Sequence, residues 1–174
     1  MMLLISITSF LVLAAYLVIM YKEFGLPSMI SDTYYQLESK TKGSGWLFTA
    51  VLWIVSFSVL LCLLDTGEGI QAFAFLGCAG LAFVGAAPQF KEQDVSSVHR
   101  LGAIVAAVGG IGWCLSVCDH FPVCCFSTAL IALQYFLYLL RCRYRKNMSH
   151  IGYWAEASAI LDVYITYWLL LVML

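Results

Sequence analysis

The last apolar stretch of the chain carries the side chains best suited to chemistry inside a membrane. Glu156 and Asp162 are the only acids that fall within the long apolar segments. A charged side chain deep in a bilayer is costly, so an acid found there commonly marks a path for an ion, a proton or a polar solute. Their position makes these two acids the first candidates for a functional site.

Helical geometry separates the two acids. They are six positions apart, so at 100° per residue they point about 120° away from each other and do not form a carboxylate pair. Asp162 instead shares its face with Ser158 and Thr166, four positions to either side. This polar stripe predicts a path with Asp162 at its centre. Glu156 falls at a depth similar to that of Gln134 in the preceding segment, and we expect a hydrogen bond between them.

A structural interpretation competes with this one. Both acids could be protonated and hold neighbouring helices together through hydrogen bonds. For Asp162 the path and the structural role are equally supported by the sequence. For Glu156 the structural one is preferred.

A second polar group is predicted at one end of the apolar segments. Asp32, His99 and His150 could converge there to bind a metal or to relay protons near neutral pH, although histidines at a membrane interface are common. His120 lies in a turn at the opposite end, so the three histidines cannot form one zinc site. The seven cysteines show no CxxC pair or metal spacing. We therefore predict no metal site and no cofactor.

Composition identifies the elements that must position these residues. Of the 174 residues, 63% are hydrophobic and 11% are charged, against about 25% charged in soluble domains. This excludes a soluble protein, and lipid leaves only helices or closed barrels as spanning structures. We predict a single all-α transmembrane domain with six spanning helices, each of about 20 residues. The predicted spans are residues 1–21, 46–64, 69–87, 101–118, 121–140 and 151–171.

The basic residues predict the orientation. All nine lysines and arginines fall in loops on one side of the predicted membrane, and such residues are retained in the cytoplasm. The predicted cytoplasmic loops are residues 22–45, 88–100 and 141–150. Both termini are then outside. The last loop begins with a basic cluster that anchors the topology and is also a candidate lipid-headgroup site: Arg141, Arg143, Arg145 and Lys146.

Two of the spans carry small residues at every fourth position, a pattern that lets membrane helices approach closely. In residues 101–118 they are Gly102, Ala106, Gly110, Cys114 and Cys118; in residues 69–87 they are Ala74, Cys78, Ala82 and Ala86. We expect these spans to form a tight antiparallel hairpin. The same faces could also join copies of the chain into a homo-oligomer.

The loop 22–45 contains a further predicted helix. Ser31 or Asp32 would begin it, because such side chains accept the first free backbone N–H groups, and it would continue through Ser39. One interpretation is a helix that lies on the membrane surface. The other is a lid over the cytoplasmic mouth of the bundle.

The formal charge of −1 provides no basic surface for nucleic acid.

Three functional hypotheses follow from these features. The first hypothesis is a membrane protein that transports, or provides a path for, a small ion, proton or polar solute. The second is a non-catalytic partner or regulator that binds another protein through its cytoplasmic loops. The third is a lipid-modifying enzyme centred on Ser31, Asp32, His99 and His150. The expected location is the inner membrane of a bacterium, in contact with membrane lipids.

Overall fold

The computed structural model describes residues 1–86, 95–118, 122–145 and 150–174. These residues form helices joined by loops and turns, with no strand among them, so the all-α fold is confirmed for this part of the chain. The helices are α1 (Met2–Phe24), α2 (Asp32–Lys40), α3 (Trp46–Thr66), α4 (Gln71–Ala86), α5 (Val95–Cys118), α6 (Pro122–Arg145) and α7 (Ile151–Met173).

Glycines end two of the long helices. Gly25 follows α1 with φ 80°, and its N–H still donates to the carbonyl of Tyr21 at 2.9 Å. Gly67 follows α3 in the left-handed conformation, with φ 67°. Side chains other than glycine rarely adopt this conformation, so each glycine stops its helix and lets the chain turn.

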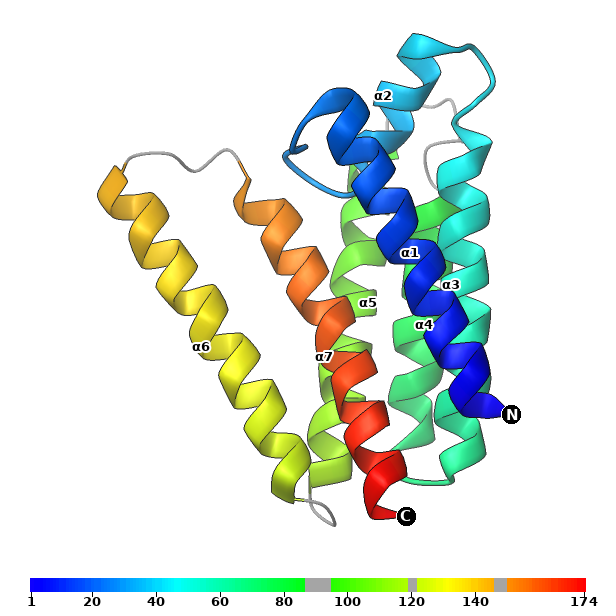
Figure 1. The fold of residues 1–174 in the computed structure, drawn as a ribbon, viewed down its shortest axis with the longest axis vertical. Helices are drawn as coiled ribbons and strands as arrows, with labels where there is room; N and C mark the ends of the chain where they lie inside the picture. The colour runs from blue at the N-terminus through cyan, green and yellow to red at the C-terminus, as the bar shows by residue number, and fades with distance from the viewer. Residues whose placement is uncertain (87–94, 119–121, 146–149) are drawn as a thin grey trace.

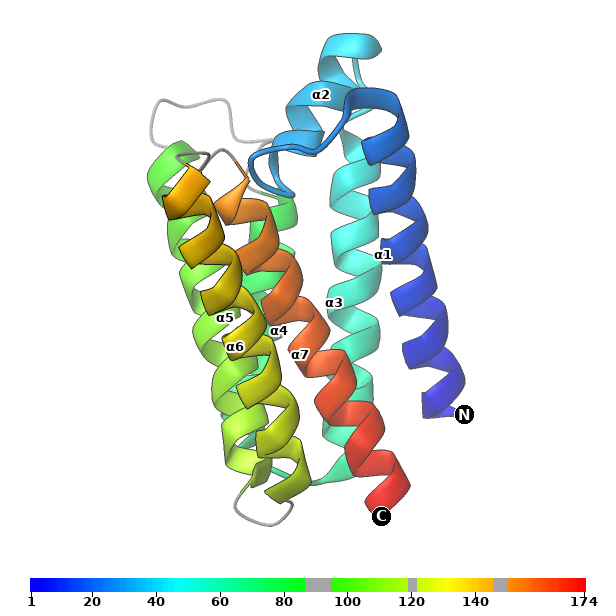
Figure 2. The same ribbon diagram turned by 60° about the vertical axis from the view of Figure 1, so that its left-hand side comes forward.

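The long helices run alternately up and down, and α2 lies across one end of the bundle (Figure 1). Both termini lie at the opposite end, as the turned view also shows (Figure 2). The loop between α1 and α2 therefore lies at the end of the bundle where α1 ends and α3 and α7 begin.

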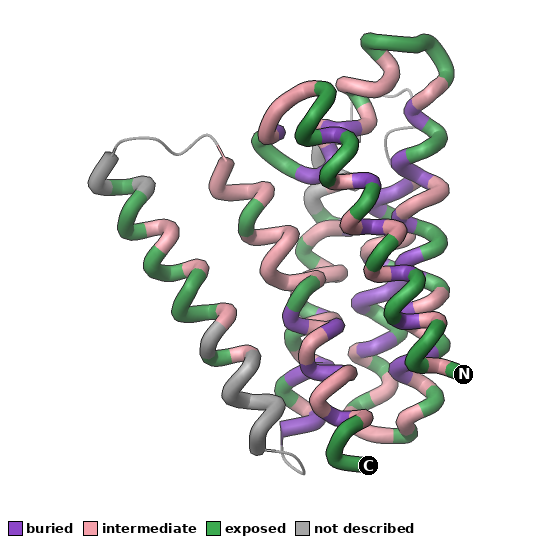
Figure 3. Tube along the Cα trace, viewed as in Figure 1, coloured by how far each residue is buried: buried purple, intermediate pink, exposed green. Residues whose placement is uncertain are grey.

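Four helical segments are long and apolar enough to cross a membrane: Met2–Phe24, Trp46–Thr66, Leu101–Cys118 and Ile151–Met173. Shorter apolar helices cover Gln71–Ala86 and Ile131–Arg141. Large apolar side chains such as Leu11, Phe57 and Val108 are exposed, and exposed positions recur along the helices of the bundle (Figure 3). Such exposure is typical of helices surrounded by lipid. The fold is that of a membrane protein.

Helices α4 and α5 pack backbone to backbone. A Cβ atom on Gly77 would lie 2.8 Å from the backbone nitrogen of Gly110, and one on Gly109 would overlap the backbone of Gly77. A Cβ atom on Gly80 would overlap Ala106 in the same way. The predicted tight hairpin is thus present.

On α4, backbone contacts closer than a Cβ atom would allow are made by Gly77 and Gly80, which do not belong to the predicted row of Ala74, Cys78, Ala82 and Ala86. Only glycine allows two helix backbones to touch in this way. Two members of the predicted row instead face α3. Ser56 donates its hydroxyl to the carbonyl of Cys78 at 2.6 Å, and Trp53 donates its indole N–H to the carbonyl of Ala82 at 3.0 Å.

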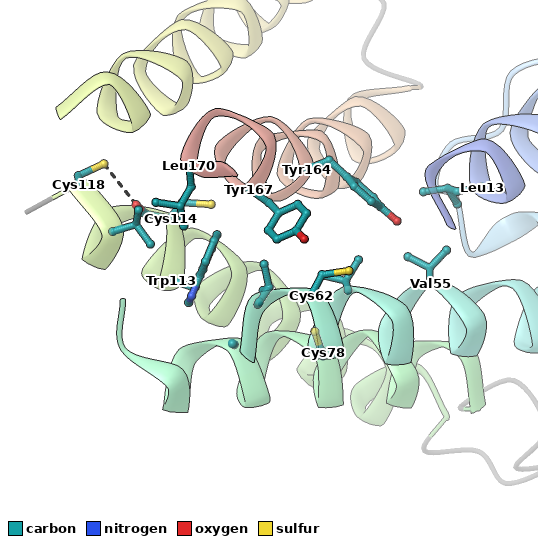
Figure 4. Close-up of a cluster of buried hydrophobic side chains, with 14 residues drawn as sticks. Leu13, Val55, Cys62, Cys78, Trp113, Cys114, Cys118, Tyr164, Tyr167 and Leu170 are labelled. Atoms are coloured by element: carbon teal, nitrogen blue, oxygen red, sulfur yellow. Dashed lines mark hydrogen bonds between the residues drawn. The ribbon is translucent and has the colours of Figure 1, made fainter. Parts of the chain in front are cut away.

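Large side chains fill the bundle near the termini. Tyr164 and Tyr167 of α7 pack there with Trp113 of α5 and Cys62 of α3 (Figure 4). Each of these four side chains is no more than 2% exposed. The facing positions closer to α2 carry much smaller residues, and this difference leaves a space inside the bundle.

Candidate functional site

A cavity of about 190 Å³ lies between α3, α4, α5 and α7. It exists because the facing helices present small side chains that do not fill the space between them. Six alanines line it: Ala74, Ala103, Ala106, Ala107, Ala155 and Ala159. The rest of the wall is mainly aliphatic, and it reaches from Ile30 at the α2 end to Leu63 near the end of α3.

Polar groups are concentrated at the α2 end of this cavity. Ser31 and Glu156 line it there. Tyr164 lines it further along α7, but its hydroxyl is hydrogen-bonded to Ser9 at 2.8 Å. The cavity is therefore an apolar tube with one polar end.

The loop between α1 and α2 closes that polar end. We call residues 25–31 the cap. Three hydrogen bonds fasten it to the beginning of α7, and their partners in the cap are Pro27, Ser28 and Ile30. Tyr153 donates its N–H to the Ser28 carbonyl at 2.8 Å, and the cap residue Ile30 donates its N–H to Oε2 of Glu156 at 2.7 Å. The third bond joins Nδ1 of His150 to the Pro27 carbonyl at 3.0 Å.

Gly152 allows this close approach. A Cβ atom there would lie 2.9 Å from Cγ of Met29 and 3.0 Å from the carbonyl oxygen of Ser28. Both atoms belong to the cap. A larger residue at this position would push the cap away from α7.

The cap is also tied to α1 and α2. Thr33 donates its hydroxyl to the Ile30 carbonyl at 2.6 Å and accepts from the hydroxyl of Tyr16 at 2.7 Å. The N–H of Met29 donates to Oδ2 of Asp32 at 3.1 Å. Ile30 is 4% exposed and Ser31 is 5% exposed. Ile30 and Ser31 of the cap line the cavity, whereas no residue of α2 does. The lid and the surface helix both stay predictions for α2.

The hydrogen bond expected between Glu156 and Gln134 is not the one that Glu156 makes. Glu156 bonds to the backbone of Ile30, whereas the side chain of Gln134 is exposed on α6. Helix α6 leans away from α7 towards the α2 end (Figure 1). The separation of the two helices at this level explains the difference.

Asp162 lies in a different environment. It is 2% exposed, and the side chains of Thr128 on α6 and Cys114 on α5 hydrogen-bond to its carboxyl group. Its Oδ1 atom is buried and has no partner among the residues that the structure describes. Asp162 does not line the cavity.

The rest of the polar stripe stays with Asp162 and away from the cavity. Thr166 is fully buried, and Ser158 donates its hydroxyl to the carbonyl of Trp154 at 2.6 Å. Neither residue lines the cavity. The stripe therefore runs along a side of α7 that Glu156 does not share.

The predicted cluster at the mouth surrounds the cap without converging on one point. Asp32 and His150 each bind the cap backbone, at Met29 and Pro27. Burial lowers the pKa of His99, and the nearby carboxylate of Asp32 partly offsets this shift. Within the described ranges, no three His, Cys, Asp or Glu side chains are arranged to hold a metal ion.

The basic cluster is described in part. Arg141 and Arg143 are exposed in the last turns of α6. Arg145 ends that helix, and its side chain and Lys146 lie outside the described residues. The end of α6 is at the α2 end of the bundle (Figure 1).

Sequence reasoning missed the backbone N–H of Ile30 and the role of Gly152. Two signals could have indicated them. Gly25 and Pro27 interrupt the chain after the first span, and Gly152 lies one helical turn before Glu156. Together they mark a loop that approaches the start of the last helix.

This chain matches no family model, no curated protein and no solved structure. The cavity and the cap are therefore the features of this chain that indicate its function. The cavity can hold an apolar group, and its polar end can accept hydrogen bonds from a head group. The hydroxyl of Ser31 makes no hydrogen bond to the first backbone N–H groups of α2. The imidazole of His150 is hydrogen-bonded to the Pro27 carbonyl.

Proposed function

We propose that this membrane protein binds a small amphipathic molecule and holds its hydrocarbon chain in the cavity beneath the cap. The observation that carries this proposal is the cavity itself, which is apolar along its length and polar at one end. An engineered apolar cavity of about 150 Å³ binds benzene. A cavity of about 190 Å³ has room for a similar apolar group.

The lining favours an apolar occupant over water. An ordered water molecule needs two to four polar partners. Away from the α2 end, the polar side chains of the wall are Cys78 and Tyr164, and the hydroxyl of Tyr164 already bonds to Ser9. A hydrocarbon chain needs no such partners, and burying each of its methylene groups contributes about 0.8 kcal/mol.

Filling the cavity tests the proposal. The Ala159→Leu substitution adds apolar atoms to the cavity wall, whereas Ala79→Leu makes the same change at an exposed position of α4. In bilayer nanodiscs, we expect Ala159→Leu to weaken binding of radiolabelled octan-1-ol about tenfold, because two or more buried methylene groups are displaced. The matched control Ala79→Leu should bind like the original protein. Equal binding by both variants would contradict the proposal.

The predicted path for a small ion or proton is a second candidate. One observation favours it, the buried Oδ1 atom of Asp162, which has no partner among the described residues. Buried polar atoms without partners are uncommon and call for an explanation. In this proposal Asp162 would act with Ser158 and Thr166. The regulator and the lipid-modifying enzyme stay as further hypotheses.

We propose six membrane crossings with the α2 end in the cytoplasm and both termini outside. Helix α4 has 16 residues and is therefore about 24 Å long. This is shorter than the hydrocarbon core of ~30 Å, and a local thinning of the bilayer would accommodate the difference. Lys40, Lys42, Arg141 and Arg143 lie in or beside helix ends at the α2 end, and such residues favour the cytoplasm. A bacterial inner membrane is the proposed location.

A homo-oligomer also stays a proposal. The glycines of α4 and α5 contact each other within the chain, so an oligomer would use another apolar surface. The exposed face of α6 around Phe136 and Leu137 is one candidate. A protein partner would bind the loops at the α2 end of the bundle.

A further inference from the structure

The polar end of the cavity offers hydrogen-bond acceptors. Within the described part of the chain, Glu156 makes one hydrogen bond, from the Ile30 N–H to Oε2, and this leaves Oε1 for another donor. Ser31 is 5% exposed and lines the cavity. It stands at the N-cap position of α2, yet its hydroxyl makes no hydrogen bond to the free backbone N–H groups in the first turn of this helix. A buried hydroxyl and a carboxylate oxygen are thus available at the same end.

Two carboxyl groups lie near each other at this end of the cavity. Asp32 lies close enough to Glu156 for the two carboxyl groups to interact electrostatically. Among the described residues, the cavity lining contains no lysine, arginine or histidine. Burial lowers the pKa of His99, which disfavours the charged form of its imidazole. None of the described lining residues therefore supplies a cation to Glu156.

We propose that the cavity binds a single-chain amphiphile whose head group is a protonated primary amine, with the ammonium donating to Oε1 of Glu156 and Oγ of Ser31. An ammonium group has three donors and no acceptor, which matches the acceptors present. A carboxylate or phosphate head would add negative charge beside Glu156 and Asp32. This inference rests on the proposed function, because it assigns the head group of the molecule whose chain fills the cavity.

Three ligands with the same chain test the assignment: octylamine, octan-1-ol and octanoate. In phosphatidylcholine nanodiscs containing the full chain, we expect octylamine to bind about tenfold more tightly than octan-1-ol, because hydrogen bonds to charged groups are the stronger ones. Octanoate should bind most weakly. Uptake by nanodiscs without the protein is partition into the bilayer and is subtracted.

Two variants locate the preference. In Glu156→Gln the amide oxygen can still accept from the Ile30 N–H, so the cap stays in place while the charge is removed. We expect the affinity for octylamine to fall about tenfold, to that of octan-1-ol, which should itself change less than about twofold. Ser31→Ala should weaken the binding of octylamine and of octan-1-ol by similar factors, each smaller than the factor expected for octylamine in Glu156→Gln.

The outcomes separate this inference from the proposed function. Failure of all three ligands to bind in an Ala159-dependent way would overturn both. Cavity-dependent binding of octan-1-ol without a preference for octylamine would leave the proposed function standing and overturn the amine assignment. An octylamine preference that persists unchanged in Glu156→Gln would also overturn it.

Discussion

Glu156 and Asp162 lie on the same helix, but they have opposite surroundings. Glu156 lines the cavity and accepts a hydrogen bond from the backbone of the cap. Asp162 is 2% exposed and is hydrogen-bonded to side chains of α5 and α6. The first acid therefore holds a loop, and the second holds two helices. An acid in a membrane span identifies a ligand site only through what it faces.

The sequence favours a structural role for Glu156 and leaves a path and a structural role equally open for Asp162. The ligand site proposed at Glu156 differs from that preference, and both roles of Asp162 stay predictions. Three substitutions can break or sharpen this contrast.

The largest effect is expected from a change that damages both surroundings at once. Helix α5 contacts Asp162 through Cys114 and lines the cavity through Ala106 and Gly110. In Gly109→Ala the new methyl group would overlap the backbone of Gly77, which cannot move aside without separating α4 from α5. We expect a loss of about 3 kcal/mol in the free energy of unfolding, measured by denaturant unfolding in mixed micelles.

Gly112→Ala is the matched control. A Cβ atom there would meet the ring of Phe73 at 3.0 Å, and a side chain can shift where a backbone cannot. Its cost should stay below about 1 kcal/mol. Equal costs for the two variants would show that the backbone contact does not limit the approach of α4 and α5.

Asp162 should show a smaller effect, confined to stability. Asp162→Ala removes the hydrogen bonds with Thr128 and Cys114 and leaves a cavity, so we expect a loss of about 2 kcal/mol. Asp162→Asn retains an acceptor and should lose less than about 1 kcal/mol. Octan-1-ol binding should be unchanged in Asp162→Asn. The path hypothesis makes a different prediction, because Asp162→Asn would then abolish an ion or proton flux in liposomes while the protein stays folded.

Local patterns predict the helices and the separation of the two acids well, because both depend only on neighbouring residues. The predicted span 151–171 corresponds to α7 at Ile151–Met173, and the helix expected from Asp32 through Ser39 is α2 at Asp32–Lys40. The angle between Glu156 and Asp162 follows from helical geometry alone. The hydrogen-bond partners of the two acids do not follow from helical geometry.

The partner of Glu156 is a backbone N–H that lies 126 positions earlier in the chain, and a backbone group leaves no signature in the sequence. The cavity is a missing volume shared by four helices, so no single segment reveals it. The role of Gly77 and Gly80 on α4 was missed for a similar reason. Small residues surround that helix on several sides, and their spacing does not tell which side meets α5.

The smallest effect sharpens the contrast at the cap itself. Glu156→Ala removes the acceptor for the Ile30 N–H, so the cap should open more often while the bundle stays folded. One lost hydrogen bond of about 1 kcal/mol corresponds to amide exchange about fivefold faster in residues 25–31. Hydrogen exchange followed by mass spectrometry measures this change, and the thermal midpoint of the whole bundle should shift little.

Glu23→Ala is the control for a nearby acid, because Glu23 forms an exposed ion pair with Lys40 at the same end of the bundle. Exposed pairs contribute little to stability, so exchange in residues 25–31 should match the original protein. Unchanged exchange in Glu156→Ala as well would mean that Thr33 and Tyr16 hold the cap without help from α7. The carboxyl group of Glu156 would then be free for a ligand but would not couple ligand binding to the closing of the cap.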